Sequence, residues 1–224
     1  SLSAATRGLF ERHFAGREAA EARFFAAPEG VDPLANIETH TIARAELNGP
    51  VTWAIIDRLQ PDLLLSYGVH KLTPETLARA PRLRWNIHGG LSPWYRGVAT
   101  HFWPSYFLQP RHTGMTVHET TEAIDGGNVV HQTAAPLVRG DGVHDLACRA
   151  VISLGDALAE LMTRLAAGTV RPPVPPTTSG RIWRNADWEP AHLHPVYDLY
   201  QNQVVDRCLD GEFGTNPPKL VRQF

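Results

Sequence analysis

The sequence is poor in cysteine and has no long apolar run. Its 224 residues include only two cysteines, Cys148 and Cys208. Both lie in helix-like stretches without metal-ligand spacing, which favours two buried structural thiols over a disulfide. No segment reaches the roughly 20 apolar residues that a membrane helix needs, and the first residues lack a signal-peptide pattern. We therefore expect a cytoplasmic protein with no membrane partner.

The sequence also lacks a charge excess of either sign. The formal net charge is −2, with 20% charged and 43% hydrophobic residues. This balance is typical of a globular protein with a buried core. It disfavours a nucleic acid or an anionic membrane held by charge alone, although a local basic patch remains an alternative.

The first half of the chain alternates between helical and strand-like patterns. The expected elements are helices over 1–25 and from Pro50, strands over 63–68 and 83–88, and a short helix from Thr73 between the two strands. A strand, a helix and a strand within so short a stretch predict a βαβ unit with a right-handed parallel crossover.

The second half contains the clearest helix, over 143–167, with an apolar stripe and Gly168 at its C-terminal cap. Before it we expect a helix over 97–108, kinked at Pro104, and strands over 115–120 and 128–132. Four prolines within 171–176 indicate an extended linker rather than packed structure. The predicted organisation is a catalytic domain over 1–170, a linker over 171–180 and a C-terminal appendage over 181–224.

Two polar residues end the second predicted strand. Asn86 and His88 are two positions apart, so their side chains lie on the same side of the strand. Ligands of parallel α/β sheets bind outside the carboxyl ends of the strands. An amide and an imidazole at such an end suit carbonyl chemistry, although a lone Asn-x-His is weak evidence.

Further motifs follow this pair in a fixed order. They are Leu91-Ser92-Pro93-Trp94-Tyr95-Arg96-Gly97, Thr113-Gly114-Met115-Thr116-Val117-His118 and Asp125-Gly126-Gly127. With Asn86-Ile87-His88, the chain here resembles the formyltransferase family, which includes glycinamide ribonucleotide, methionyl-tRNA and sugar N-formyltransferases. The resemblance covers about 62–132 and continues more weakly to Leu165. It implies an α/β, Rossmann-like fold with a mostly parallel central sheet flanked by helices, plus the small C-terminal appendage.

The resemblance also implies a reaction. The enzyme would move a formyl group from 10-formyltetrahydrofolate, its co-substrate, to a primary amine. Asn86 would donate a hydrogen bond to the developing oxyanion, and His88 would shuttle a proton. Asp125 would orient a water and favour the charged form of His88. We interpret His118 as a core imidazole with a satisfied nitrogen, and we assign no metal site.

Binding residues follow from the same resemblance. The folate would lie against Tyr67, Gly68, Leu72, Glu119, Thr120 and Asp125, and the acceptor amine against Gly90, Tyr95 and Arg96. Two of these have structural alternatives: Leu72 can be an ordinary core residue, and Arg96 can hold its own loop in shape.

The sequence departs from the family pattern in two places. Family members usually begin with a strand, a turn and a helix, whereas this sequence starts directly in a helical pattern. That unit is either absent or outside the residues given. In addition, Gly89-Gly90 and Ser92 stand where Pro-Ser and Leu are more common, which predicts either a bulkier acceptor or a repositioned loop.

Competing functions remain at this point. A 10-formyltetrahydrofolate hydrolase would share Asn86, His88 and Asp125, and an inactive folate-binding domain would retain the fold. Tyr95-Arg96-Gly97 favours transfer over hydrolysis. The acceptor is expected to be an amino sugar nucleotide or another amine of specialised metabolism, and a homodimer is left open. The aromatic residues of the appendage would stack on a base, join two subunits or pack on their own domain.

Overall fold

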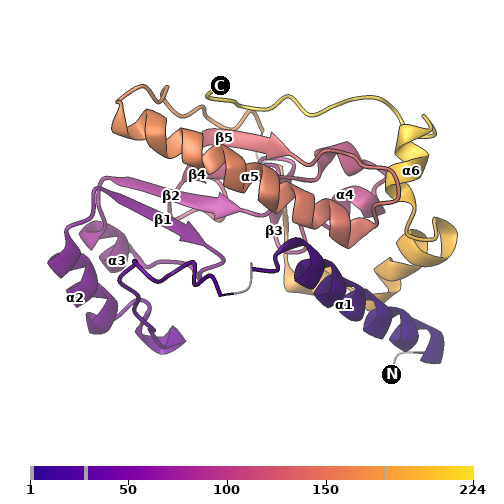
Figure 1. The fold of residues 1–224 in the computed structure, drawn as a ribbon, viewed down its shortest axis with the longest axis horizontal. Helices are drawn as coiled ribbons and strands as arrows, with labels where there is room; N and C mark the ends of the chain where they lie inside the picture. Colours follow the sequence, from indigo (N-terminus) through magenta and orange to yellow (C-terminus); the bar gives the residue numbers. More distant parts are fainter. Residues whose placement is uncertain (1–2, 28–29, 179) are drawn as a thin grey trace.

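A four-stranded sheet organises the molecule in the computed structural model, which describes residues 3–27, 30–178 and 180–224. The strand order is β1-β2-β4-β5, and α5 lies along one face of the sheet (Figure 1). The strands are β1 (Leu63–Tyr67), β2 (Leu83–His88), β4 (Gly114–Glu119) and β5 (Val129–Ala134). The α/β class expected from the sequence is confirmed.

The predicted βαβ unit is present, but the sheet is mixed rather than mostly parallel. β1 and β2 are parallel and are joined through α3 (Pro74–Arg79). Both other pairings are antiparallel. After β2 the chain stays at the carboxyl end of that strand, where the Gly90 carbonyl accepts the Thr116 hydroxyl of β4. Strand β4 therefore runs antiparallel to β2. The segment 120–128 between β4 and β5 is too short for a parallel crossover, which needs about a dozen residues.

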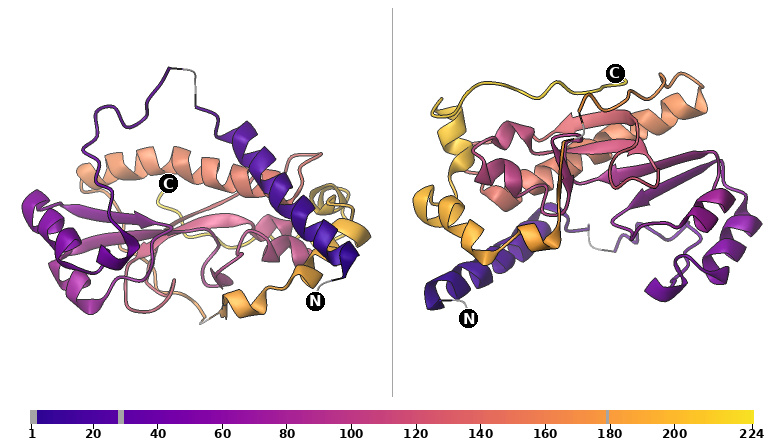
Figure 2. Two further views of the ribbon diagram at one scale, coloured as in Figure 1. Left: turned by 90° about the horizontal axis from the view of Figure 1, so that it is seen from below. Right: turned by 180° about the vertical axis from the view of Figure 1, so that it is seen from behind.

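Helices surround this sheet at both ends (Figures 1 and 2). The α-helices not yet given are α1 (Ala4–Phe24), α2 (Pro50–Leu59), α4 (Trp103–Tyr106), α5 (Val143–Ala166) and α6 (Val204–Leu209). Short 3-10 turns occupy Arg44–Glu46, Pro110–His112, Asn185–Asp187 and Pro190–His192, and a π-helical turn occupies Pro195–Leu199. Helix α1 packs on α5, at the opposite end of the molecule from α2 and α3.

The helix expected over 97–108 is wrong. Residues 95–97 form a short strand instead, β3 (Tyr95–Gly97), and only one helical turn follows in α4. Gly97 and Ala99 have φ angles of +91° and +54°, which a right-handed helix does not allow. A side chain at Gly97 would also collide with the carbonyl oxygen of Trp183.

Two separate hydrophobic cores stabilise the fold. The sheet core lies between α5 and the sheet and is mainly aliphatic; its buried members are Trp85, Met115, Val117, Val130, Ala135, Leu146, Ala150, Leu154, Leu161 and Val205. The aromatic core lies under α1 and the appendage; its buried members are Leu9, Tyr95, Phe102, Trp103, Val143, Trp183, Leu193, Val196 and Tyr197. The aromatic core therefore joins the appendage to the rest of the molecule.

The appendage and the proline-rich segment are integrated into the domain. Strand β6 (Arg181–Trp183) pairs in parallel with β3. The segment over 171–176 is extended as predicted, but it is packed, because Val174 exchanges two backbone hydrogen bonds with Val129 of β5. The C-terminal tail lies along the same strand, where Gln132 N donates to the Val221 carbonyl at 2.8 Å.

Several expectations about composition can be compared with this structure. Cys148 and Cys208 are both free and buried, as predicted. Within residues 3–27, 30–178 and 180–224, no helix is long and apolar enough to cross a bilayer. The same residues contain no cluster of three or more histidine, cysteine or acidic side chains arranged to hold a metal ion.

Candidate active site

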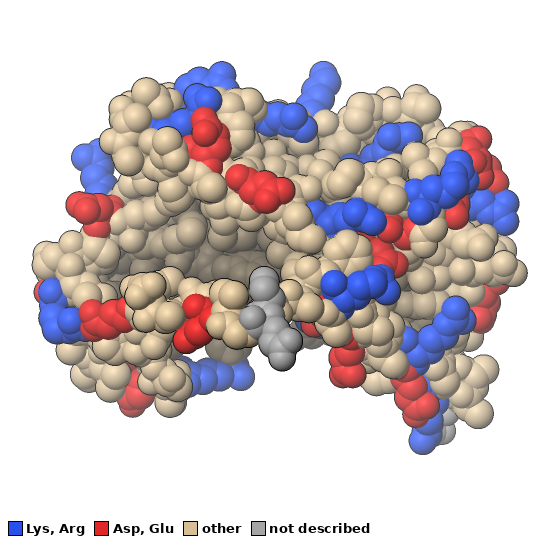
Figure 3. Space-filling view, in the orientation of Figure 1, with Lys and Arg blue, Asp and Glu red and all other residues tan. Residues whose placement is uncertain are grey.

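A large cleft opens beside the ends of β1 and β2. Its volume is about 1330 Å³, and Figure 3 shows the hollow with walls made mostly of uncharged residues. Asn86, His88 and Asp125 all line it. The structure therefore brings together the three residues for which the sequence predicted a catalytic role.

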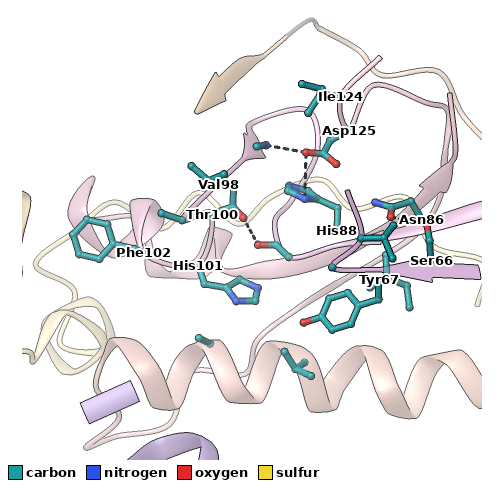
Figure 4. A pocket seen from close by; sticks show the side chains of 18 of the residues that line it. Ser66, Tyr67, Asn86, His88, Val98, Thr100, His101, Phe102, Ile124 and Asp125 are labelled. Carbon is teal, nitrogen blue, oxygen red and sulfur yellow. Dashed lines mark hydrogen bonds and ion pairs between the residues drawn. The ribbon is translucent and has the colours of Figure 1, made fainter. Parts of the chain in front are cut away.

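His88 and Asp125 lie next to each other at this cleft (Figure 4). His88 Nε2 donates to the carbonyl oxygen of Tyr95 at 2.8 Å, so a proton taken up by the neutral ring goes to Nδ1. Nδ1 lies 3.4 Å from Asp125 Oδ2. The same carboxylate oxygen accepts the backbone N–H of Gly97 at 2.8 Å, which fixes its position. An imidazolium at His88 would therefore form beside a fixed carboxylate.

Asn86 is oriented from both sides. Its Oδ1 accepts the Ser66 hydroxyl at 2.8 Å, and its Nδ2 lies 3.2 Å from His118 Nε2. His118 Nδ1 donates to the Glu119 carbonyl at 2.8 Å, so the neutral ring presents an unprotonated Nε2 to Asn86. One of the two Nδ2 hydrogens is used on His118, and the other is available to a ligand.

His118 also connects Asn86 to Asp125. Its Nε2 lies 3.5 Å from Asp125 Oδ1, on the carboxylate oxygen that His88 does not face. The ring is buried, with a partner on each nitrogen, which agrees with a satisfied imidazole. Its place between two candidate catalytic residues gives it a positioning role that its interpretation as a core residue did not include.

Burial sets the charge states of this site. It lowers the pKa of His88 despite the opposing effects of the Asp125 carboxylate and of the hydrogen bond to Tyr95. Burial by itself would raise the pKa of Asp125, but the neighbouring His118 and His88 rings and the hydrogen bond from the Gly97 N–H outweigh it, so the net direction is downward. The resting site therefore pairs a neutral imidazole with an ionised carboxylate at neutral pH.

The structure places most of the residues predicted to bind folate at the cleft, but not all of them. Tyr67, Gly68, Leu72 and Thr120 line the cleft together with Asp125. The Thr120 hydroxyl is buried and has no hydrogen-bond partner among the described residues. Glu119 does not line the cleft; its carboxylate accepts the Asn128 side-chain amide at 2.8 Å and closes the loop between β4 and β5.

The residues predicted to bind the acceptor all lie outside the cleft lining. The Tyr95 hydroxyl donates to Gln109 at 2.8 Å within the protein. Gly90 packs so closely that a Cβ atom would lie 2.6 Å from the Tyr95 carbonyl oxygen and 2.8 Å from His88 Nε2. Arg96 donates from Nε to the Ile124 carbonyl at 3.1 Å, which fits the alternative in which it holds a loop in shape. That loop carries Asp125.

The cleft also contains residues that the sequence analysis did not assign. Ser66 and His101 lie close to the catalytic residues (Figure 4), and His13, Phe14 and Arg17 of α1 also line the cleft. Ser66 follows the apolar run of β1, so its position at a strand end was a usable signal. The α1 residues gave no comparable signal, because their approach to the cleft depends on contacts distant in sequence.

Comparison with known proteins supplies the family. The sequence profile of the formyl transferase family matches residues 21–158, more than half of the chain. The chain belongs to the formyltransferase family. This result confirms the resemblance recognised in the motifs and shows that the protein is a formyltransferase-type enzyme.

Solved structures of formyltransferases have the same fold. The formyltransferase PseJ from Anoxybacillus kamchatkensis, solved with UDP-4,6-dideoxy-4-formamido-L-AltNAc and tetrahydrofolate, is 21% identical with a TM-score of 0.54, covering 64% of this chain and 74% of its own. A sugar N-formyltransferase from a Shewanella species is 19% identical with a TM-score of 0.56, covering 80% and 74%. A 4-N formyltransferase from Francisella tularensis is 18% identical with a TM-score of 0.55, covering 76% and 72%.

Proposed function

We propose that this formyltransferase moves a formyl group from 10-formyltetrahydrofolate to the primary amine of a nucleotide-linked amino sugar. The observation that carries the proposal is the meeting of Asn86, His88 and Asp125 in one cleft, with Asp125 within 3.5 Å of two imidazole rings. The complex of PseJ with a formylated UDP-sugar and tetrahydrofolate supports this choice of donor and acceptor.

The chemistry follows from the hydrogen bonds of the site. The amine nitrogen attacks the formyl carbon, and the carbonyl oxygen becomes an oxyanion that accepts the second Nδ2 hydrogen of Asn86. The amine loses a proton, which His88 holds at Nδ1 beside Asp125. The bond between the formyl carbon and the folate nitrogen then breaks, and that nitrogen takes up the proton that His88 held and leaves as a neutral amine.

The segments at the ends of β1 and β4 suit the folate. Tyr67, Val69 and Ile124 are apolar, exposed residues at the cleft. The buried, unpartnered hydroxyl of Thr120 offers a hydrogen-bond donor and acceptor to a polar ring edge. Apolar walls with a few fixed polar groups are typical of cofactor sites.

Hydrolysis of 10-formyltetrahydrofolate needs a direct test. The resemblance favoured transfer because hydrolases of this family typically lose the loop motif that stands here as Tyr95-Arg96-Gly97. Here Tyr95 and Gly97 bind His88 and Asp125 through their backbones, and Arg96 holds the adjoining loop. Such a motif would support attack by water as well as by an amine.

Release of tetrahydrofolate, followed by absorbance, tests the proposal. The assay contains 10-formyltetrahydrofolate and a panel of amines, including UDP- and dTDP-linked amino sugars, with a blank that lacks amine. His88→Ala should lower kcat by about 10² to 10⁴. His40→Ala, an exposed histidine outside the cleft, serves as the matched control and should leave kcat unchanged.

Each outcome decides between functions. Release that requires one sugar nucleotide and is lost in His88→Ala supports the proposed transfer. Release in the blank, equally lost in that variant, identifies a hydrolase. Unchanged release in His88→Ala contradicts the assigned role of this histidine.

A further inference from the structure

The far end of the cleft includes segments that lie outside the family match. His13, Phe14 and Arg17 of α1 and Asn185 and Trp188 of the appendage line it. The formyl transferase profile matches only residues 21–158. The catalytic end comes from strands and loops within the matched residues, whereas these five residues lie outside the matched range. We call this far end the α1 end of the cleft.

The two ends belong to one continuous cavity. His101, His88 and Arg17 all line this single cavity. The volume of about 1330 Å³ exceeds the roughly 300–1,000 Å³ typical of a site for one small ligand. The cleft therefore has room for a folate and a second substrate.

Arg17 supplies positive charge at the α1 end. Burial lowers the pKa of both His13 and His101 to about 4, so these neighbours are neutral at neutral pH. Arg17 donates from Nε to Glu21, which also lines the cleft, at 2.7 Å, in a pair whose side chains are 57% and 44% exposed. Exposed pairs of this kind contribute little, about 0–1 kcal/mol. The terminal nitrogens of Arg17 have no hydrogen-bond partner in the described part of the chain, so they can meet an anionic ligand.

An aromatic wall adjoins this cation. Phe14 lies one turn before Arg17 on the same face of α1, with 37% of its surface exposed. Its ring lies 6.4 Å from Trp188, which in turn lies 6.2 Å from Phe102. Exposed aromatic faces beside a guanidinium suit a ligand that combines a flat ring with an anionic group.

We propose that Arg17 and Phe14 of α1 bind the nucleoside diphosphate part of the acceptor, with Arg17 on the phosphates and Phe14 against the base. This inference rests on the proposed formyl transfer to a sugar nucleotide and names the residues that hold that substrate. The sugar amine then points along the cleft toward His88, while the folate occupies the segments at the ends of β1 and β4.

Calorimetry on the full 224-residue chain tests the inference, with uridine diphosphate, thymidine diphosphate and inorganic pyrophosphate as probes. Arg17→Gln should weaken binding of all three probes about tenfold or more, because it removes charged hydrogen bonds. Phe14→Ala should weaken binding of the two nucleotides by about five- to a hundredfold and leave pyrophosphate unchanged, because only the base stacks.

Two matched controls lie on the same helix. Arg7→Gln and Phe24→Ala replace an exposed and a half-buried residue of α1 that do not line the cleft, and both should bind all probes as the unmodified chain does. Circular dichroism of each variant verifies that α1 remains folded. A loss confined to Arg17→Gln and Phe14→Ala therefore reports on the cleft rather than on the helix.

Two results would overturn the inference: failure of the unmodified chain to bind either nucleotide at millimolar concentration, or equal affinity in Arg17→Gln. The proposed function is tested separately by tetrahydrofolate release. If transfer to a sugar nucleotide persists with an unchanged KM in Arg17→Gln, the inference fails and the function stands. If the nucleotides bind through Arg17 but no amine is formylated, the binding site stands and the proposed transfer fails.

Discussion

The two hydrophobic cores support opposite ends of the cleft and are built on different principles. The sheet core packs aliphatic side chains of α5 against the sheet, including β2, which carries Asn86 and His88 of the catalytic end. The aromatic core joins α1, α4 and the appendage beneath the α1 end, and polar links accompany it. One such link runs from His13 through the Tyr197 hydroxyl to His144, at 2.9 Å and 3.2 Å. The catalytic end therefore rests on nonpolar packing, and the α1 end rests partly on hydrogen bonds between titratable groups.

The largest expected effect breaks the sheet core. Leu154 of α5 is 2% exposed, and Leu154→Ala should lower the free energy of unfolding by about 3–5 kcal/mol, because it leaves a cavity. Leu154→Met, which keeps the volume, should cost less than about 1.5 kcal/mol. Urea unfolding measures both variants. Similar small losses in both would show that the sheet core repacks freely, unlike a close-packed interior.

Acid should weaken the aromatic core by a smaller amount. His13 is 8% exposed, and burial lowers its pKa to about 4 from 6.5. The unfolded chain binds a proton below about pH 6.5, but the folded chain resists until about pH 4. Stability should therefore decrease as the pH falls through this window, by up to about 3 kcal/mol from His13 alone. Unfolding curves at pH 7 and pH 4.5 measure the decrease.

His13→Gln should reduce this dependence of stability on pH, because a glutamine side chain does not titrate. His70→Gln is the control, since His70 is exposed and lies outside the aromatic core. An equal acid sensitivity in His13→Gln and the unmodified chain would assign the effect to other groups.

The smallest expected effect removes one hydroxyl. Tyr197→Phe deletes the group between His13 and His144 and should lower the free energy of unfolding by about 1–3 kcal/mol, because buried ring nitrogens lose a partner. Tyr200→Phe is the matched control, since the Tyr200 hydroxyl has no hydrogen-bond partner among the residues that the structure describes. Thermal unfolding compares the two. No difference between them would show that the link is energetically neutral.

The same contrast explains how much could be predicted from the sequence. The apolar runs of β1 and β2 and the stripe of α5 are local patterns, so these elements were predicted with nearly their observed bounds. Asn86, His88 and Asp125 were found through ordered motifs, and the structure places all three at the cleft. Patterns within a few residues of each other were sufficient for these features.

Long-range contacts explain what was missed. Nothing in α1 indicates that His13 meets Tyr197, which is 184 positions away. The strand β3 forms because it pairs with residues 181–183, which are far away in the sequence. The local sequence near Gly97 does not reveal this partner, and it was interpreted as a helix. Arg96 and Tyr95 stand in a loop motif whose partners, Ile124 and Gln109, are determined only by the folded loop. Their backbone and side chains stabilise the site instead of lining it.

The outer edge of β5 gives the protein one further property. Val174 and Val221 bind its backbone at Val129 and Gln132, and the Gln223 N–H donates to His131 at 3.1 Å. A strand with an open row of N–H and C=O groups can recruit a strand from another molecule, which is a common start of aggregation. Here the chain's own proline-rich segment and tail occupy that row at Val129 and Gln132. The residues after α5 thus cover part of this strand edge and hinder edge-to-edge growth of the sheet.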